Sequence, residues 1–362
     1  MIQDSKTNIY GRITVILSFC VISVLLININ TVTAAVRSAL SMCASSIIPS
    51  LFPFMILSDI IISKGDIKYF AKKFGVPFSV FFGISPVGVC AFLLGVVCGF
   101  PVGGKICASL CECGALTRDE CERLLPYVNN TSPAFIIGCV GANMLGSVKT
   151  GIVLFCIQTF TSILIGLIER RKRSDIINIT KENDIINIAN KSTINNSDAL
   201  SNIKSENNIK NKQINANEKN SKVNDYRNAD KQKGATFAES VKRGAENTIY
   251  LCAFVVTFSL ICRIIALFIK NTVLLSAIAS FLEIGSAAAL ITKNVPLCPQ
   301  LFLPLLSFSL SFSGLSVFFQ TCVFTVPVKI GMKRYIIYKF IGGAISAIIM
   351  FLYIKTGLLG AM

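Results

Sequence analysis

The chain has 362 residues, of which 53% are hydrophobic and only 15% are charged, and its formal net charge is +16. Because an average soluble protein carries about 25% charged residues, this composition argues against an ordinary soluble enzyme. The chain also contains no histidine, which excludes histidine-based triads, histidine metal ligands and the usual proton shuttle. We therefore expect a protein that is not an enzyme and that uses no cofactor and no metal.

Long apolar runs predict membrane-spanning helices along the whole chain. Residues 13–29 and 150–168 contain no charged residue, and each run is long enough to cross a hydrocarbon core of about 30 Å. The first run is interpreted as an uncleaved first helix. The sequence thus predicts an all-α, polytopic transmembrane protein embedded in a lipid bilayer. Further candidate spans are residues 34–63, 80–99, 248–269, 272–291, 301–319 and 335–354.

Basic residues predict the orientation of the chain. Arg170-Arg171-Lys172-Arg173 follows the run that ends at Ile168, and such clusters favour the cytoplasmic side of a membrane. Lys6 and Arg12 precede the first run, which predicts a cytoplasmic N-terminus as well. Because no stripe of aromatic and basic residues accompanies the charge, no nucleic acid is expected as a partner.

Composition divides the chain into three parts. Residues 1–168 form a predicted N-terminal membrane half and residues 239–362 a C-terminal half. Between them, residues 169–238 are basic and rich in asparagine. A segment with so few large apolar groups cannot offset its chain entropy, so it is predicted to be a disordered cytoplasmic linker.

Proline and glycine interrupt apolar runs in both halves. Pro49 and Pro53 fall within residues 34–63, and Pro304 has a similar place in the second half. Helices broken in a bilayer persist where the freed backbone groups are buried in protein or line a polar cavity. Paired broken segments are typical of transporters. We therefore expect broken or re-entrant helices in two halves that resemble an inverted repeat.

Two motifs near the start of the polar region 101–133 resemble a nucleotide-binding loop and a zinc site, and we reject both interpretations. Gly99–Lys105 has the G-x-x-x-x-G-K spacing of a P-loop, but Ile106 stands where a Ser or Thr would hold magnesium. The nearby cysteines fit no standard zinc spacing. They are Cys107, Cys111, Cys113 and Cys121.

The same region predicts a helical hairpin. Residues 104–114 are compatible with a short helix. Thr117 is followed three residues later by Glu120, a capping-box spacing that predicts a second helix running to about Tyr127.

Neutral hydrogen-bonding groups gather where helices are predicted to break. Asn129–Pro133 reads NNTSP, and a second polar stretch lies at Ser307–Gly314, followed by Gln320. Amides and hydroxyls at a helix break suit a neutral, hydroxyl-rich solute. Helix capping and hydrogen bonding between helices remain the alternative interpretation.

One acid falls in an apolar segment of each half, Asp59 in the first and Glu283 in the second. Acids within a membrane are costly, so each is a functional candidate, although Asp59 has the alternative of reaching the interface near Lys64. The predicted solute-binding residues are Asp59, Lys105, Asn129, Asn130, Glu283 and Gln320.

Three segments carry a family resemblance: residues 99–141, 48–59 and 311–321. Together they resemble the YlbJ-type sporulation integral membrane proteins, which belong to the group with the nucleoside-recognition, or Gate, domain. The resemblance implies a multi-pass protein of the bacterial cell membrane, needed for endospore formation, with a Gate-like region at 34–168 and a nucleoside-like solute. It does not extend to the linker, which departs from the family pattern as an insertion.

Two functional hypotheses follow. The first is a protein that moves or senses a small polar solute at a broken-helix site during spore maturation. The second is a scaffold that does not transport and recruits sporulation partners through its linker. A homo-oligomer is compatible with both.

Overall fold

The computed structural model describes residues 22–63, 71–170 and 236–357, together with the single residues 15, 19 and 67. Its regular elements in these ranges are all helices, which confirms the predicted all-α class. Seven of the seventeen residues of the predicted first span, 13–29, lie outside the described residues, as does most of the predicted linker.

The first half begins with one long helical segment and continues through shorter helices. The long segment consists of α2 (Ile29–Met42), the π-helical turn η1 (Cys43–Ile47) and α3 (Ile48–Ser63). The elements that follow are η2 (Ala71–Gly75), α5 (Val76–Phe82), α6 (Pro86–Cys98), α7 (Val102–Glu112), α8 (Arg118–Val128), the π-helix η3 (Ala134–Met144) and α9 (Val148–Ile168).

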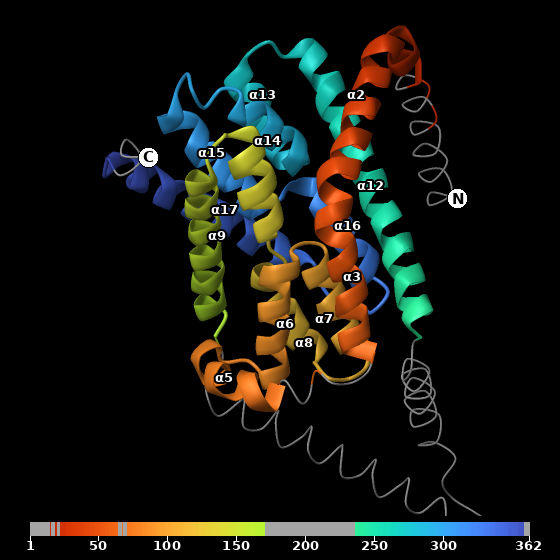
Figure 1. The fold of residues 1–362 in the computed structure, drawn as a ribbon, viewed down its shortest axis with the longest axis vertical. Helices are drawn as coiled ribbons and strands as arrows, with labels where there is room; N and C mark the ends of the chain where they lie inside the picture. Colours follow the sequence, from red (N-terminus) through yellow and green to blue (C-terminus); the bar gives the residue numbers. More distant parts are fainter. Residues whose placement is uncertain are drawn as a thin grey trace, which may run out of the picture.

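The second half also begins and ends with long helices. Its elements are α12 (Phe237–Phe268), α13 (Thr272–Leu282), α14 (Ile284–Thr292), α15 (Pro299–Phe312), α16 (Gly314–Thr325) and α17 (Lys333–Lys355). Helices α6 and α7 lie toward the lower end of the molecule in Figure 1, whereas α13 and α14 lie in its upper part. Each half thus contains a helical pair joined by a short turn, then two helices separated by a short break. The predicted inverted repeat itself stays a prediction.

Five helical segments are long and apolar enough to cross a membrane. Many of their large apolar side chains point outward, among them Phe160, Ile249 and Leu352, each more than half exposed. Outward apolar side chains of this number are expected where lipid is the solvent. The five segments are Ile29–Ile62, Val148–Ile168, Phe237–Phe268, Pro299–Thr325 and Lys333–Lys355, and shorter apolar helices accompany them.

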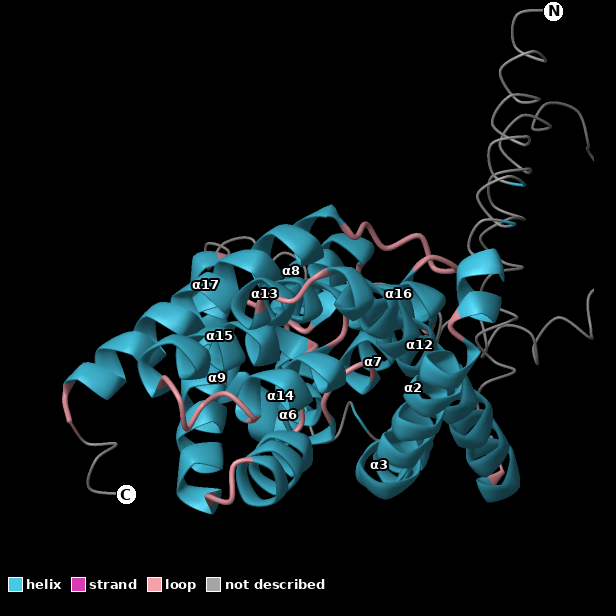
Figure 2. Cartoon of the chain, turned by 90° about the horizontal axis from the view of Figure 1, so that it is seen from above, coloured by secondary structure: helices cyan, strands magenta, loops and turns pink. Residues whose placement is uncertain are grey.

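The long helices stand on two sides of the molecule. Seen from above, α2, α3 and α12 form one side, and α9, α15 and α17 form the other (Figure 2). Helices α6, α7, α14 and α16 lie between them. The turns and breaks of the short helices are therefore held within the protein, as a bilayer requires.

Three boundaries differ from the sequence prediction, each for a local reason. The chain does not break at Pro49 or Pro53. Instead it widens into the turn η1, where the carbonyl of Ser45 would clash with the Pro49 ring in a regular α-helix. The expected single span 272–291 is two helices, because Glu283 adopts an extended conformation between α13 and α14.

The third difference concerns the expected span 301–319, which breaks at Ser313 and not at a proline. Ser313 and Gly314 have φ values of 76° and 79°, and two successive left-handed residues end an α-helix. Pro304 remains inside α15.

The predicted cap of α8 is confirmed in part. Thr117 accepts a hydrogen bond from the Glu120 backbone N–H at 3.2 Å. The Glu120 carboxylate, however, accepts from the Ser85 N–H at 2.7 Å instead of completing a capping box. Glu120 thereby joins α8 to the start of α6 and is buried.

Candidate functional site

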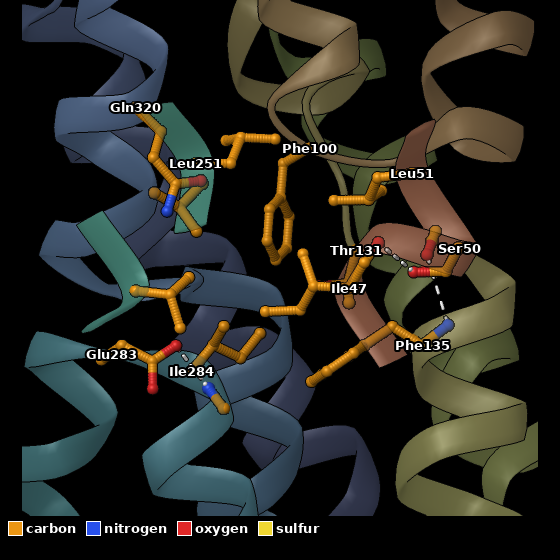
Figure 3. A pocket seen from close by; sticks show the side chains of 14 residues that line it. Ile47, Ser50, Leu51, Phe100, Thr131, Phe135, Leu251, Glu283, Ile284 and Gln320 are labelled. Atoms are coloured by element: carbon orange, nitrogen blue, oxygen red, sulfur yellow. Dashed lines mark hydrogen bonds between the residues drawn. The ribbon is translucent and has the colours of Figure 1, made fainter. Parts of the chain in front are cut away.

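A small cavity lies where the helix breaks of both halves meet. Its walls include Phe100 from the α6–α7 turn, Thr131 and Ser132 from the α8–η3 break, Glu283 from the α13–α14 turn, and Gln320 from α16. Figure 3 shows Phe100, Glu283 and Gln320 around the cavity, with Ile47 and Leu51 completing the wall. The cavity thus combines an apolar lining with a few polar groups, as binding sites for small molecules usually do.

The cavity is small in this conformation. Its free volume is about 30 Å³, enough for a water molecule or two. Sites that hold ligands of nucleoside size are roughly 300–1,000 Å³. Any solute larger than a few atoms would require the surrounding turns to move apart.

Each helical pair touches the break of the helices that follow it in the same half. A Cβ atom at Gly99, in the α6–α7 turn, would lie 2.6 Å from the Ser132 Cβ. A Cβ atom at Gly314, in the α15–α16 break, would lie 3.1 Å from the Leu282 carbonyl group. Both glycines have positive φ, so they supply the turn and the close approach together.

Glu283 lies at the α13–α14 turn and caps the start of α14. Its carboxylate accepts from the Gly285 N–H at 2.8 Å, from the Ser286 N–H, and from the Ser259 hydroxyl at 3.3 Å. The side chain is 1% exposed and also lines the cavity. These contacts account for how a buried acid is tolerated there.

Asn129 joins the two halves. Its side-chain oxygen accepts from the Gly104 N–H at 3.2 Å, and its amide donates to Thr321 and Tyr335 at 2.9 Å each. The residue is fully buried. The Asn129 side chain therefore ties the end of α8 to α7, α16 and α17, but it is not part of the cavity wall.

Asn130 and Thr131 continue this network. The Ser162 hydroxyl donates to the Asn130 side-chain oxygen at 2.8 Å, and the Asn130 amide donates to the Tyr127 carbonyl. Thr131 donates to the Leu310 carbonyl at 2.6 Å. The alternative interpretation of the polar run, hydrogen bonding between helices, thus describes Asn129 and Asn130.

Three serines at the α15–α16 break are different. The hydroxyls of Ser309, Ser311 and Ser313 are buried and have no hydrogen-bond partner among the described residues. An unpaired polar group in a buried place costs about 1–3 kcal/mol. Water or a polar ligand would satisfy them.

Asp59 and Lys105 come together, but away from the cavity lining. The Lys105 ammonium lies 3.1 Å from the Asp59 carboxylate, and the Arg243 guanidinium lies 2.8 Å from its other oxygen. This ion-pair cluster joins α3, α7 and α12. Of the six predicted site residues, Glu283 and Gln320 line the cavity, whereas these two and the two asparagines support the elements around it.

The sequence did not single out Lys339. It is 4% exposed on α17, and its ammonium donates to the Asn129 carbonyl at 3.0 Å. No carboxylate pairs with it among the described residues. A lysine within KRYIIYKFIGG, at the start of a predicted span, is ordinarily expected to reach the membrane interface, so only the packing reveals its burial.

Comparison with known proteins identifies one curated relative. The chain is 30% identical over 136 residues to the sporulation integral membrane protein YlbJ of Bacillus subtilis (strain 168). The aligned part covers 38% of this chain and 33% of the relative, so the match spans about a third of that protein's length. No family model matches the chain, and no solved structure matches it. The predicted resemblance to the YlbJ-type sporulation integral membrane proteins is therefore confirmed over these 136 residues.

Proposed function

We propose that this chain is a bacterial membrane protein of endospore formation that binds a small polar solute at the central cavity and passes it across the membrane. The cavity carries the proposal, because it lies where both helical turns meet the α8–η3 break and α16. The link to sporulation rests on the similarity to YlbJ, a sporulation integral membrane protein that matches this chain over part of its length.

The chemistry of the walls favours a neutral solute with hydroxyl groups. Thr131, Ser132 and Gln320 offer donors and acceptors without a net charge. The unpaired hydroxyls of the α15–α16 break lie in the same region of the chain as Gln320. Phe100 and Leu251 supply apolar contact. A nucleoside-like solute fits this lining, because its ring would contact the apolar side chains and its sugar hydroxyls would bond to the polar ones.

Movement of the two helical turns would open the cavity. The α6–α7 pair lies toward one end of the molecule and the α13–α14 pair toward the other (Figure 1). If each turn moved away in alternation, the cavity would open to one side at a time, as in transporters built from broken helices.

Complementation of spore formation tests the proposal. An endospore-forming host that lacks this protein would receive the wild-type gene, Gln320→Ala or Ser132→Ala, with membrane levels measured by blotting. We expect normal accumulation and fewer heat-resistant spores, because both changes remove polar groups from the cavity wall. Ser280→Ala is the matched control, since Ser280 is equally buried but bonds within its own helix to the Ser276 carbonyl.

Full spore counts in both cavity variants would contradict a role for the cavity in function. The scaffold hypothesis would then gain support, provided that deletion of the linker abolished spore formation.

A further inference from the structure

A second, larger pocket lies at the end of the molecule where α9 ends and α17 begins. Its volume is about 510 Å³. Three arginines and two acids line it, together with three isoleucines and a tyrosine. The lining residues are Asp119, Arg123, Ile168, Glu169, Arg170, Arg334, Ile337, Tyr338 and Ile341.

The pocket has an excess of positive charge, because three guanidinium groups face two carboxylates. Arg334 lies 3.7 Å from Asp119 and 3.7 Å from Glu169, and its side chain is 44% exposed. The pair with Asp119, in which both side chains are almost half exposed, contributes little binding energy. Arg334 is therefore able to exchange the Asp119 carboxylate for a better anion at little cost.

Arg123 is held in a fixed position deeper in the pocket. Its side chain is 6% exposed and lies 3.4 Å from the Asp119 carboxylate, and it donates to the Glu169 carbonyl at 3.4 Å. Its Nε faces Asp119 in an ion pair whose geometry does not make a hydrogen bond. This buried guanidinium adds fixed positive charge to the pocket.

One wall of the pocket is apolar and faces outward. Ile168 is 58% exposed, Ile337 46% and Ile341 37%. Ile168 is the last residue of α9, and the other two lie in the first turns of α17. Because α9 and α17 are both long enough to cross a bilayer, this wall lies near the boundary between acyl chains and headgroups.

We propose that this pocket binds the phosphate group of an anionic phospholipid. Arg334 and Arg170 contact the phosphate, and the three isoleucines contact the acyl chains. Arginine suits this ligand because its planar donors match phosphate oxygens in pairs. The sequence continues with Arg171, Lys172 and Arg173, which adds positive charge after Arg170 and favours an anionic membrane surface.

Native mass spectrometry of the full chain in detergent tests this site. The protein would be titrated with phosphatidylglycerol and, separately, with phosphatidylcholine of the same acyl chains. We expect tighter binding of phosphatidylglycerol, and a loss of roughly 10- to 30-fold in the double variant Arg170→Gln/Arg334→Gln, from about 1 kcal/mol for each basic residue.

The matched control removes two positive charges from a pocket elsewhere in the fold. Arg263 and Lys293 line a cavity of about 330 Å³ between α2, α12, α13 and α14. The double variant Arg263→Gln/Lys293→Gln is expected to bind phosphatidylglycerol like the wild type. Equal loss in both double variants would overturn the proposal, because it would mean that net charge alone attracts the lipid.

Two further outcomes would also overturn it. Equal retention of phosphatidylglycerol and phosphatidylcholine would show that the pocket does not recognise the anionic headgroup. Complete displacement of phosphatidylglycerol by millimolar inorganic phosphate would show that free phosphate is the ligand.

Discussion

Asn129 carries more of the contact between the two halves than its size suggests. One buried amide group makes three hydrogen bonds, to α7, α16 and α17. Each partner is itself buried, so removal of the amide leaves several groups unpaired. At the scale of single residues, the polar network around the α8–η3 break is chiefly a means of holding the helices together.

The first prediction concerns this amide. Asn129→Ala is expected to lower the free energy of unfolding by about 1–3 kcal/mol for each partner left unpaired. Thermal unfolding of the purified protein in detergent measures the effect as a lower midpoint. Asn294→Ala is the control, because Asn294 is half-buried and bonds only within its own turn to the Leu290 carbonyl. Similar midpoints for the two variants would contradict the inferred role.

Lys339 gives a second prediction at the same scale. A buried ammonium group loses its hydration, and its described bond is to one carbonyl. Lys339→Met keeps most of the side-chain length and removes the charge. We expect no loss of thermal stability and a modest gain, because the cost of burying an ammonium group exceeds that of leaving one carbonyl unpaired. The control is Lys293→Met on the exposed side of the fold. A clearly lower midpoint for Lys339→Met would show that the Asn129 carbonyl needs its cationic partner.

The elements explain why the cavity is where it is. Helices α13 and α14 turn at Glu283, α15 and α16 separate at Ser313, and the two sites are in direct contact through Gly314. The same relation joins the α6–α7 turn to the α8–η3 break through Gly99. The shape of the cavity therefore depends on how closely the backbone of each turn approaches the backbone of the neighbouring break.

Gly314→Ala tests this contact. The φ of 79° costs roughly 1–2 kcal/mol for a residue with a Cβ atom, and the new Cβ would also press on the Leu282 carbonyl. Gly146→Ala is the matched control, since Gly146 has a φ of 67° with nothing within 4 Å. We expect Gly314→Ala to lower the unfolding midpoint further than the control. An equal fall in the unfolding midpoint of both variants would mean that the positive φ alone accounts for the loss. The α13–α14 turn would then be able to move away from the new Cβ atom.

At the scale of the whole molecule, the described residues of the two halves contact each other directly. Asn129 bonds to residues of the second half, and Asp59 of α3 pairs with Arg243 of α12. The segment between the halves is basic and of low complexity. Its composition suggests a spacer.

Deletion of residues 174–233 is therefore expected to leave membrane accumulation and spore formation intact. Complementation with the shortened gene, alongside the wild type, measures both. The full-length protein with its linker sequence scrambled is the control for linker length. Loss of spores with normal accumulation would favour the scaffold hypothesis over solute movement.

The sequence by itself determined the class of this protein and several of its long helices. Apolar length predicted the spans within α9, α12 and α17, because an apolar run that is long enough to cross a bilayer and holds at most one charged residue has few other uses. It also identified Glu283 and Gln320, which are polar groups in apolar segments. These features depend on residues that are close together in the sequence, so they can be predicted from the sequence alone.

Only the tertiary structure decided which polar groups share a site. The breaks at Glu283 and Ser313 depend on backbone angles that no proline marks, and the approach of Gly314 to Leu282 joins residues far apart in the chain. Asp59 and Asn129 were predicted to bind solute as Glu283 was, yet Asp59 pairs with Lys105 and Asn129 ties helices together. The sequence shows that a polar group in an apolar segment will need a hydrogen-bond partner. The packing of the helices determines which group becomes that partner.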